Sequence, residues 1–222
     1  MTFELDLITE NAGAILGGIG MTILLWVVGT VLGSALGFLA AVGRRYGPAP
    51  LRWLLLGYVE LIRGTPFLIQ LYLLYYGGPA IGIWLDNFPA GLIGLGIYGG
   101  AYYSELFRAG FEAVPRGRIE AAEVVGLTAA QTMRRIILPE MTMLVLPAMV
   151  NMTILLLKET AVLSVISVQE LTNVAAVIGS ANYAYVTAFA VLALVYWALV
   201  EVCGAAGRAA EARLSRYRFA AA

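Results

Sequence analysis

Apolar residues in this chain form long runs that contain no charged side chain. No Asp, Glu, Lys or Arg occurs from Asn11 to Gly43. A membrane-spanning helix needs about 20 apolar residues, so this run predicts a span within residues 15–42. Similar runs predict four more spans, at residues 53–77, 88–107, 140–157 and 184–203. The pattern therefore predicts an all-α membrane protein with five transmembrane helices.

The second of these spans contains a break. Gly64-Thr65-Pro66 directly follows Glu60 and Arg63. Proline removes a backbone donor and disfavours helix in the residue before it. Two placements follow: a long helix that starts near Trp53 and is interrupted here, or an interfacial helix that ends here. We favour the long, interrupted helix, in which Glu60 and Arg63 are close at i,i+3 spacing.

Glycines in the first span share one face. Gly29, Gly33 and Gly37 recur every four residues, which places them above one another on a helix. A ridge of small residues lets a second helix approach closely. We expect a packing surface here rather than a binding site.

Composition supports the membrane class and removes several others. Apolar residues make up 61% of the chain and charged residues 13%, against about 45–50% and about 25% in soluble domains. The chain has no His and a single cysteine, Cys203. This excludes an internal disulfide and every Ser-His, Cys-His or His-ligated metal mechanism. We therefore assign no catalytic residue, metal site or cofactor site to the chain.

Nearly all basic residues lie in every second loop between the predicted spans. Thirteen of the fourteen lie in or beside the first loop, the third loop or the C-terminal tail: Arg44, Arg45, Arg52, Arg63, Arg108, Arg116, Arg118, Arg134, Arg135, Arg208, Arg213, Arg216 and Arg218. The N-terminal segment and the second and fourth loops have only acidic charges: Glu4, Asp6, Glu10, Asp86 and Glu170. Cytoplasmic loops are rich in Lys and Arg, so the N-terminus is predicted outside and the C-terminus inside. Residues 1–14 then form an outer segment, 15–208 the membrane domain and 209–222 a cytoplasmic tail.

The third loop, residues 108–139, has the pattern of a helical hairpin. Pro115 is well placed to start a short helix, and Gly126 is well placed to stop it. Between them an apolar stripe recurs at helical spacing, formed by Ile119, Ala122 and Val125. The hairpin either lies solvated at the membrane surface or presents a small amphipathic helix to a groove on a partner.

A second helix of this loop is predicted from its capping residues. Thr128 is followed three residues later by Gln131, which is the spacing of a capping box. Arg134 and Arg135 then lie at the membrane surface, just before the chain returns to the bilayer.

Four segments resemble the polar amino-acid permeases of binding-protein-dependent ABC importers. The third loop is similar to the family's EAA loop through Glu120-Ala121-Ala122, Gly126 and Ile137-Leu138-Pro139. The other similar segments are Arg63-Gly64-Thr65-Pro66 with Gln70, Gly100-Ala101-Tyr102 with Glu105 and Arg108, and Lys158-Glu159-Thr160 with Ser164 and Glu170-Leu171. The resemblance extends from about Gly18 to Arg208.

Four positions depart from the family's usual pattern. Arg118 and Glu140 each stand where the family usually has Gln. Glu159-Thr160-Ala161 stands where it usually has Asp-Thr-Ser.

The resemblance implies a type I importer permease in the bacterial inner membrane, which moves a polar amino acid or a closely related small solute. The residues it implies for coupling to an ATPase are Glu120, Ala121, Ala122, Gly126, Leu138 and Pro139. It implies ABC ATPase subunits, a second permease subunit (the same or paralogous) and an external solute-binding protein as partners. ATP and Mg would be bound by the ATPase, since the only lysine, Lys158, is not part of a Gly-x4-Gly-Lys-Ser/Thr loop.

Polar residues inside the spans are candidates for the substrate path. A charge at a helix centre costs about 2.5–3.5 kcal/mol on insertion scales, so it calls for a functional hypothesis. The tentative path comprises Arg63, Thr65, Gln70, Lys158, Glu159 and Thr160. Lys158 and Glu159 point about 100° apart on a helix, and either a substrate or gating role or a salt bridge between subunits fits them. For Arg63 we favour support of the broken backbone over contact with a substrate carboxylate, and for Glu105 we favour pairing with Arg108.

Two other classes of function were weighed against a permease. A secondary transporter or channel working without an ATPase would also carry charged residues in its helices, but it would leave the hairpin of residues 108–139 unexplained. An intramembrane enzyme lacks its usual catalytic groups, because the chain has no His and one Cys.

Overall fold

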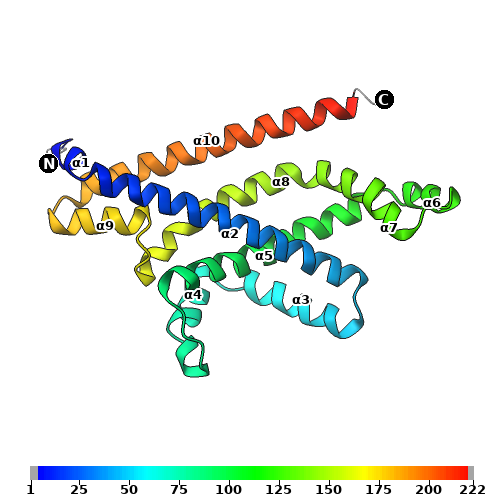
Figure 1. The fold of residues 1–222 in the computed structure, drawn as a ribbon, viewed down its shortest axis with the longest axis horizontal. Helices are drawn as coiled ribbons and strands as arrows, with labels where there is room; N and C mark the ends of the chain where they lie inside the picture. The colour runs from blue at the N-terminus through cyan, green and yellow to red at the C-terminus, as the bar shows by residue number, and fades with distance from the viewer. Residues whose placement is uncertain (1–4, 220–222) are drawn as a thin grey trace.

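The computed structural model describes residues 5–219, and the side chains of residues 6–213. Within this range the chain folds into helices joined by short turns (Figure 1). The longer helices are α2 (Ala12–Tyr46), α3 (Ala49–Arg63), α4 (Phe67–Tyr75), α5 (Asn87–Ala113), α8 (Leu138–Glu159), α9 (Leu171–Ala181) and α10 (Tyr185–Phe219). The shorter elements are α1 (Leu5–Glu10), η1 (Gly78–Ile81), α6 (Arg116–Val124), α7 (Ala129–Thr132), the π-helix η2 (Met133–Ile137) and the 3₁₀ helix η3 (Thr160–Ile166).

Helix α5 forms the centre of the molecule. It packs against α2 along much of its length, and also against α8, α3 and α4. Its 27 residues span about 40 Å at 1.5 Å per residue. Small residues make up much of its buried surface, since Gly91, Gly94, Gly96, Gly99, Gly100 and Ala101 are all buried. The small side chains let neighbouring helices approach α5 on several sides.

The glycine ridge predicted on α2 is a packing surface, as expected. A Cβ added at Gly29 would lie 3.1 Å from the Cβ of Leu95, and one at Gly33 would lie 3.1 Å from the Cα of Gly99. At Gly37 the added atom would lie 2.6 Å from the Cβ of Tyr103. The backbones of α2 and α5 therefore come closest where α2 has only hydrogen for a side chain.

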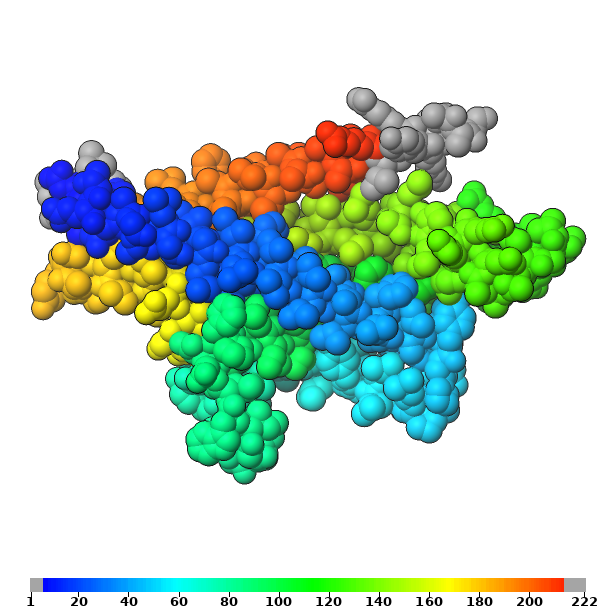
Figure 2. Space-filling model, in the orientation of Figure 1, coloured from blue at the N-terminus to red at the C-terminus, as the bar shows by residue number. Residues whose placement is uncertain are grey.

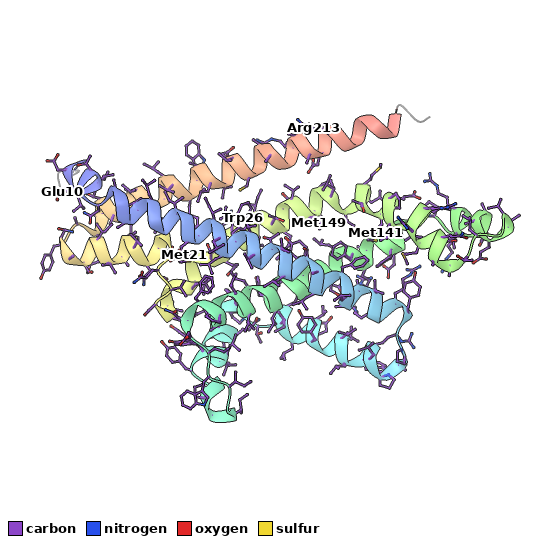
Figure 3. All side chains as sticks on the ribbon, in the orientation of Figure 1. Glu10, Met21, Trp26, Met141, Met149 and Arg213 are labelled. Atoms are coloured by element: carbon purple, nitrogen blue, oxygen red, sulfur yellow. The ribbon has the colours of Figure 1, made fainter. Side chains whose placement is uncertain are left out.

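Polar contacts join α2, α5 and α8 in the middle of this packing. Trp26 is labelled on α2 in Figure 3. Its indole nitrogen donates a hydrogen bond of 2.8 Å to the carbonyl oxygen of Thr153 on α8. The hydroxyls of Thr153 and Tyr103 are 2.7 Å apart. These bonds fix α8 against both of its neighbours at one level of the bundle.

Judged by length and apolar composition, fewer helices qualify as membrane spans than the five predicted. Within the described residues, three helical stretches are long and apolar enough to cross a membrane: Ala12–Tyr46, Ala129–Ile166 and Tyr185–Arg213. The α3–α4 pair raises the number to four if it counts as one span. Helix α5 covers the predicted span at residues 88–107 but is not selected, because its many glycines and tyrosines contribute little hydropathy. The chain is a multi-pass membrane protein, and the count of five stays a prediction.

The predicted break in the second span is present, but the chain also turns there. Helix α3 ends at Arg63, α4 begins at Phe67, and the two helices are bent by 109°. The interruption is therefore confirmed, whereas a single span over residues 53–77 stays a prediction. In Figure 1, α4 and the segment that follows it leave the bundle sideways, whereas α3 runs beside α2.

Candidate functional site

A cluster of charges surrounds Glu105 on α5. Its carboxylate accepts a hydrogen bond from Arg44 on α2 and forms an ion pair of 2.8 Å with Arg108. Arg63, the last residue of α3, lies 3.8 Å away. The side chain of Glu105 is only 19% exposed. One largely buried carboxylate therefore holds the ends of α2 and α3 against α5, and the predicted pairing of Glu105 with Arg108 is confirmed.

The ion-pair partner of Arg63 lies on another helix. Among the described ion pairs, Arg63 pairs with Glu105 and none joins it to Glu60, which is exposed on α3. Its guanidinium also lies 5.6 Å from the centre of the Tyr102 ring. Glu60 and Arg63 do share α3 at i,i+3 spacing, as predicted, but the packing of α3 on α5 brings a less exposed carboxylate to Arg63.

Thr65 and Gln70 support the backbone at the bend. The Gln70 amide nitrogen donates to the carbonyl oxygens of Ile62, at 2.7 Å, and Thr65, at 3.0 Å. The Thr65 hydroxyl donates to the carbonyl oxygen of Leu61 at 2.8 Å. A break in a helix leaves carbonyl groups without their usual donors, and an unpaired buried carbonyl is costly. Two of the predicted path residues thus perform the backbone support that we had assigned to Arg63.

An aromatic row leads from Arg63 toward Glu159. The ring centres of Tyr102 and Tyr98 on α5 are 4.8 Å apart, and that of Phe67 on α4 lies 4.9 Å from Tyr98. The Glu159 carboxylate acts electrostatically on Tyr98. The Arg63 guanidinium therefore neighbours one ring of this row, and the Glu159 carboxylate influences another.

Lys158 and Glu159 lie in different surroundings. Lys158 is exposed on α8 and lines a hollow of about 310 Å³ together with Tyr196 and Trp197 of α10. Glu159, the last residue of α8, is half-buried. Within the described ion pairs neither residue takes part. This separation agrees with their adjacent positions on one helix, where neighbours point about 100° apart.

Thr160 belongs to a buried polar network that sequence reasoning missed. Its hydroxyl donates to the carbonyl oxygen of Leu157 at 2.7 Å and lies 3.2 Å from the Tyr196 hydroxyl. Tyr196 donates in turn to the carboxylate of Glu170, a fully buried residue. The network joins η3, α10 and the start of α9.

Glu170 caps the N-terminus of α9. Its carboxylate accepts the backbone N–H groups of Thr172, at 2.9 Å, and Asn173, at 2.8 Å. Burial raises the pKa of this carboxyl above its ordinary value, while the backbone donors act in the opposite direction. An acidic residue just before an apolar helix is a usual capping signal, and it could have identified this role.

The hairpin of the third loop has the predicted elements. Pro115 precedes α6, and Gly126 follows it with a φ of +78°, a conformation that favours glycine. Thr128 and Gln131 form both bonds of the predicted capping box. The apolar stripe is confirmed only in part, since Ala122 is 2% exposed whereas Val125 is 73% exposed. The hairpin forms one end of the elongated molecule (Figure 2).

A hollow of about 610 Å³ lies between the hairpin and α8. Its lining is mostly apolar and comprises Arg118, Ala121, Ala122, Val125, Leu127, Arg135, Ile136, Pro139, Glu140, Met143 and Leu144. Among the residues predicted to couple to an ATPase, Ala121, Ala122 and Pro139 therefore border one open space. Glu120 is exposed on the surface of α6.

Comparison with known proteins defines the class. Residues 33–216 match the family described as the binding-protein-dependent transport system inner membrane component. The chain is 34% identical over 215 residues to a probable amino-acid ABC transporter permease, YckA of Bacillus subtilis, covering 97% of this chain and 95% of the relative. It is 36% identical over 214 residues to the L-cystine transport system permease TcyB of the same bacterium, covering 96% and 92%. The chain belongs to this family of permease subunits, as its motifs predicted.

Solved structures share the arrangement of helices. The structure described as an amino acid ABC transporter with histidines matches with a TM-score of 0.89 and 33% identity, over 96% of this chain and all of that one. An inward-facing structure of the MetNI methionine ABC transporter matches with a TM-score of 0.71 at 21% identity, over 95% and 99%. The second likeness concerns the fold alone.

Proposed function

We propose that this chain is the membrane-spanning subunit of an ATP-driven importer of a polar amino acid or a closely related small solute. The observation that carries the proposal is the match to amino-acid permeases over nearly the whole chain, together with the hairpin that the EAA motif predicts. The chain resides in a bacterial inner membrane, with its N-terminus outside and its C-terminus inside. The confinement of arginine to alternate connections supports this orientation.

The importer needs partners that this chain does not contain. Two ATPase subunits bind ATP and Mg and dock on the hairpin, a second permease completes the pore, and an external solute-binding protein delivers the substrate. The exposed faces of the hairpin support the docking role: Val124 is 88% exposed and Val125 is 73% exposed. A transporter working alone has no use for such a hairpin, and no comparison favours that alternative.

The substrate path follows the aromatic row on α5. An amino acid carries an ammonium and a carboxylate that must leave water, and each needs a partner of opposite charge. Glu159 accepts the ammonium or a cationic side chain, and Arg63 attracts the carboxylate. Glu159 acts electrostatically on Tyr98, and Arg63 neighbours Tyr102. Thr65 and Gln70 hold the bend that presents Arg63, and Thr160 anchors the helix end beside Glu159.

Uptake by reconstituted protein tests this path. Glu159→Gln keeps the size of the side chain and removes its charge. We expect assembly with the ATPase to be retained and uptake into proteoliposomes, with binding protein outside and ATP inside, to fall at least tenfold, about 1.4 kcal/mol. Glu201→Gln is the matched control, because it removes an exposed carboxylate from α10, away from the row.

The possible outcomes separate the alternatives. Wild-type uptake by Glu159→Gln contradicts its place on the path. Loss of assembly favours the salt bridge between subunits instead. If the wild-type chain transports without any ATPase, the importer proposal itself is wrong.

A further inference from the structure

Helix α6 of the hairpin has few buried contacts with the rest of the chain, chiefly through Ile119, which packs against the hydrophobic core. Ala122 is the one buried residue of α6, and both valines at the end of this helix are largely exposed. The hollow of about 610 Å³ takes the place of a packed core between α6 and α8. Displacement of one helix reaches another through the contacts between them. Where those contacts are few, a single link across the hollow transmits a larger share of the displacement than any one contact in a packed interface.

An ion pair bridges the hollow. Nη1 of Arg118 on α6 lies 2.6 Å from Oε1 of Glu140 on α8, and both residues line the space. The side chain of Glu140 is 18% exposed, whereas that of Arg118 is 60% exposed. The second oxygen of Glu140 is buried without a hydrogen-bond partner. A largely buried carboxylate is costly without a cation beside it, so Glu140 depends on Arg118.

The other charges at this place do not replace the pair. Arg135 also lines the hollow, but among the described ion pairs of Glu140 the partner is Arg118. Along the chain, the hairpin reaches α8 through the π-helix η2, whose backbone hydrogen bonds run from residue i to residue i+5. The ion pair is a direct, non-covalent route around that segment.

We propose that the Arg118–Glu140 ion pair transmits movement of the hairpin to α8, and that the two residues work only as a matched pair. This inference rests on the proposed function, since it concerns coupling to the ATPase. Two glutamine amides can hydrogen-bond to each other and leave no charge buried, so a neutral pair serves the same link. A carboxylate facing an amide, or a guanidinium facing an amide, leaves one charge without its partner.

Paired substitutions test the inference. Arg118→Gln and Glu140→Gln are each combined with wild-type ATPase and binding protein in proteoliposomes. The measured quantity is the ratio of solute imported to ATP hydrolysed. We expect each single variant to lower this ratio at least fivefold while the ATPase still co-purifies, and the double variant Arg118→Gln/Glu140→Gln to return to within twofold of wild type. Glu112→Gln is the control, because it removes an exposed ion pair within α5 only.

Each outcome has one meaning for the inference. Low ratios in both single variants with recovery in the double variant support it. Wild-type ratios in both single variants, or a double variant as impaired as either single one, overturn it. Loss of the ATPase from a single variant also overturns it, because the pair would then hold the assembly rather than transmit movement. A wild-type chain that never stimulates an ATPase contradicts the proposed function instead.

Discussion

The close contact between α2 and α5 leads to a quantitative prediction at Gly37. A Cβ at this position would lie 2.6 Å from the Cβ of Tyr103, 2.8 Å from the backbone nitrogen of Ser104 and 2.9 Å from the carbonyl oxygen of Gly100. Ordinary contacts between carbon atoms are about 3.5–4.0 Å. Two of the three atoms belong to the backbone of α5, which cannot rotate away. Gly37→Ala must therefore push the two helices apart.

The size of the effect follows from two opposing contributions. Overpacking a tight interface costs about 1–3 kcal/mol, whereas replacing Gly by Ala in a helix gains up to about 1 kcal/mol. The net loss for Gly37→Ala is therefore at most about 2 kcal/mol. For a chain of this length, that lowers Tm by up to about 8 °C.

Two other glycines of α2 provide matched controls. A Cβ at Gly20 would have no atom within 4 Å, so Gly20→Ala keeps only the helix gain. At Gly29 the nearest atom is the Cβ of Leu95, at 3.1 Å, a less severe approach than the 2.6 Å at Gly37. We expect Tm in detergent to fall in the order Gly20→Ala, Gly29→Ala, Gly37→Ala. Equal Tm values for the first and last of these would refute the packing argument.

Further predictions address the buried cap, the hairpin turn and the orientation of the chain. Burial raises the pKa of Glu170, so the folded chain binds this proton more tightly than the unfolded chain. The contribution of Glu170 to stability therefore falls as pH rises from the unfolded-state pKa to the folded-state pKa. Glu170→Gln should remove this part of the pH dependence of Tm, and an unchanged profile would speak against the prediction. Gly126→Val forces a β-branched residue to a φ of +78°, which costs about 1–2 kcal/mol, and should reduce stimulated ATPase activity; Gly117→Ala, with open space around its Cβ position, should not. In a background without the native cysteine, Asp86→Cys should react with an impermeant thiol reagent added to intact cells, whereas Arg213→Cys should be protected. The reverse labelling would overturn the proposed orientation.

Local chemistry explains which parts of the structure were predictable. Thr128, Gln131 and Gly126 act on backbone groups within a few residues, so their spacing alone specifies the hairpin. The signal at Pro66 likewise marks where the helix stops. It carries no information about the 109° turn, because the direction of α4 depends on how it packs against α5.

Contacts between distant segments account for what was missed. Arg63 has Glu60 three residues away, but it pairs with Glu105, 42 positions along the chain, through the packing of α3 on α5. Val125 continues an apolar stripe and yet stays exposed, because α6 faces a hollow rather than a packed surface. Helical periodicity predicts which side chains share a face, and it does not predict whether another element covers that face.

The π-helix η2 changes the angular phase of the chain between the hairpin and α8. Five residues, Met133–Ile137, occupy a turn that is wider than an α-helical turn. Each residue of an α-helix advances about 100° around the axis, so one additional residue in a turn rotates everything before it by a similar angle relative to α8. Deleting a single residue from this segment would leave every helix intact and turn the hairpin to face a different side of the molecule.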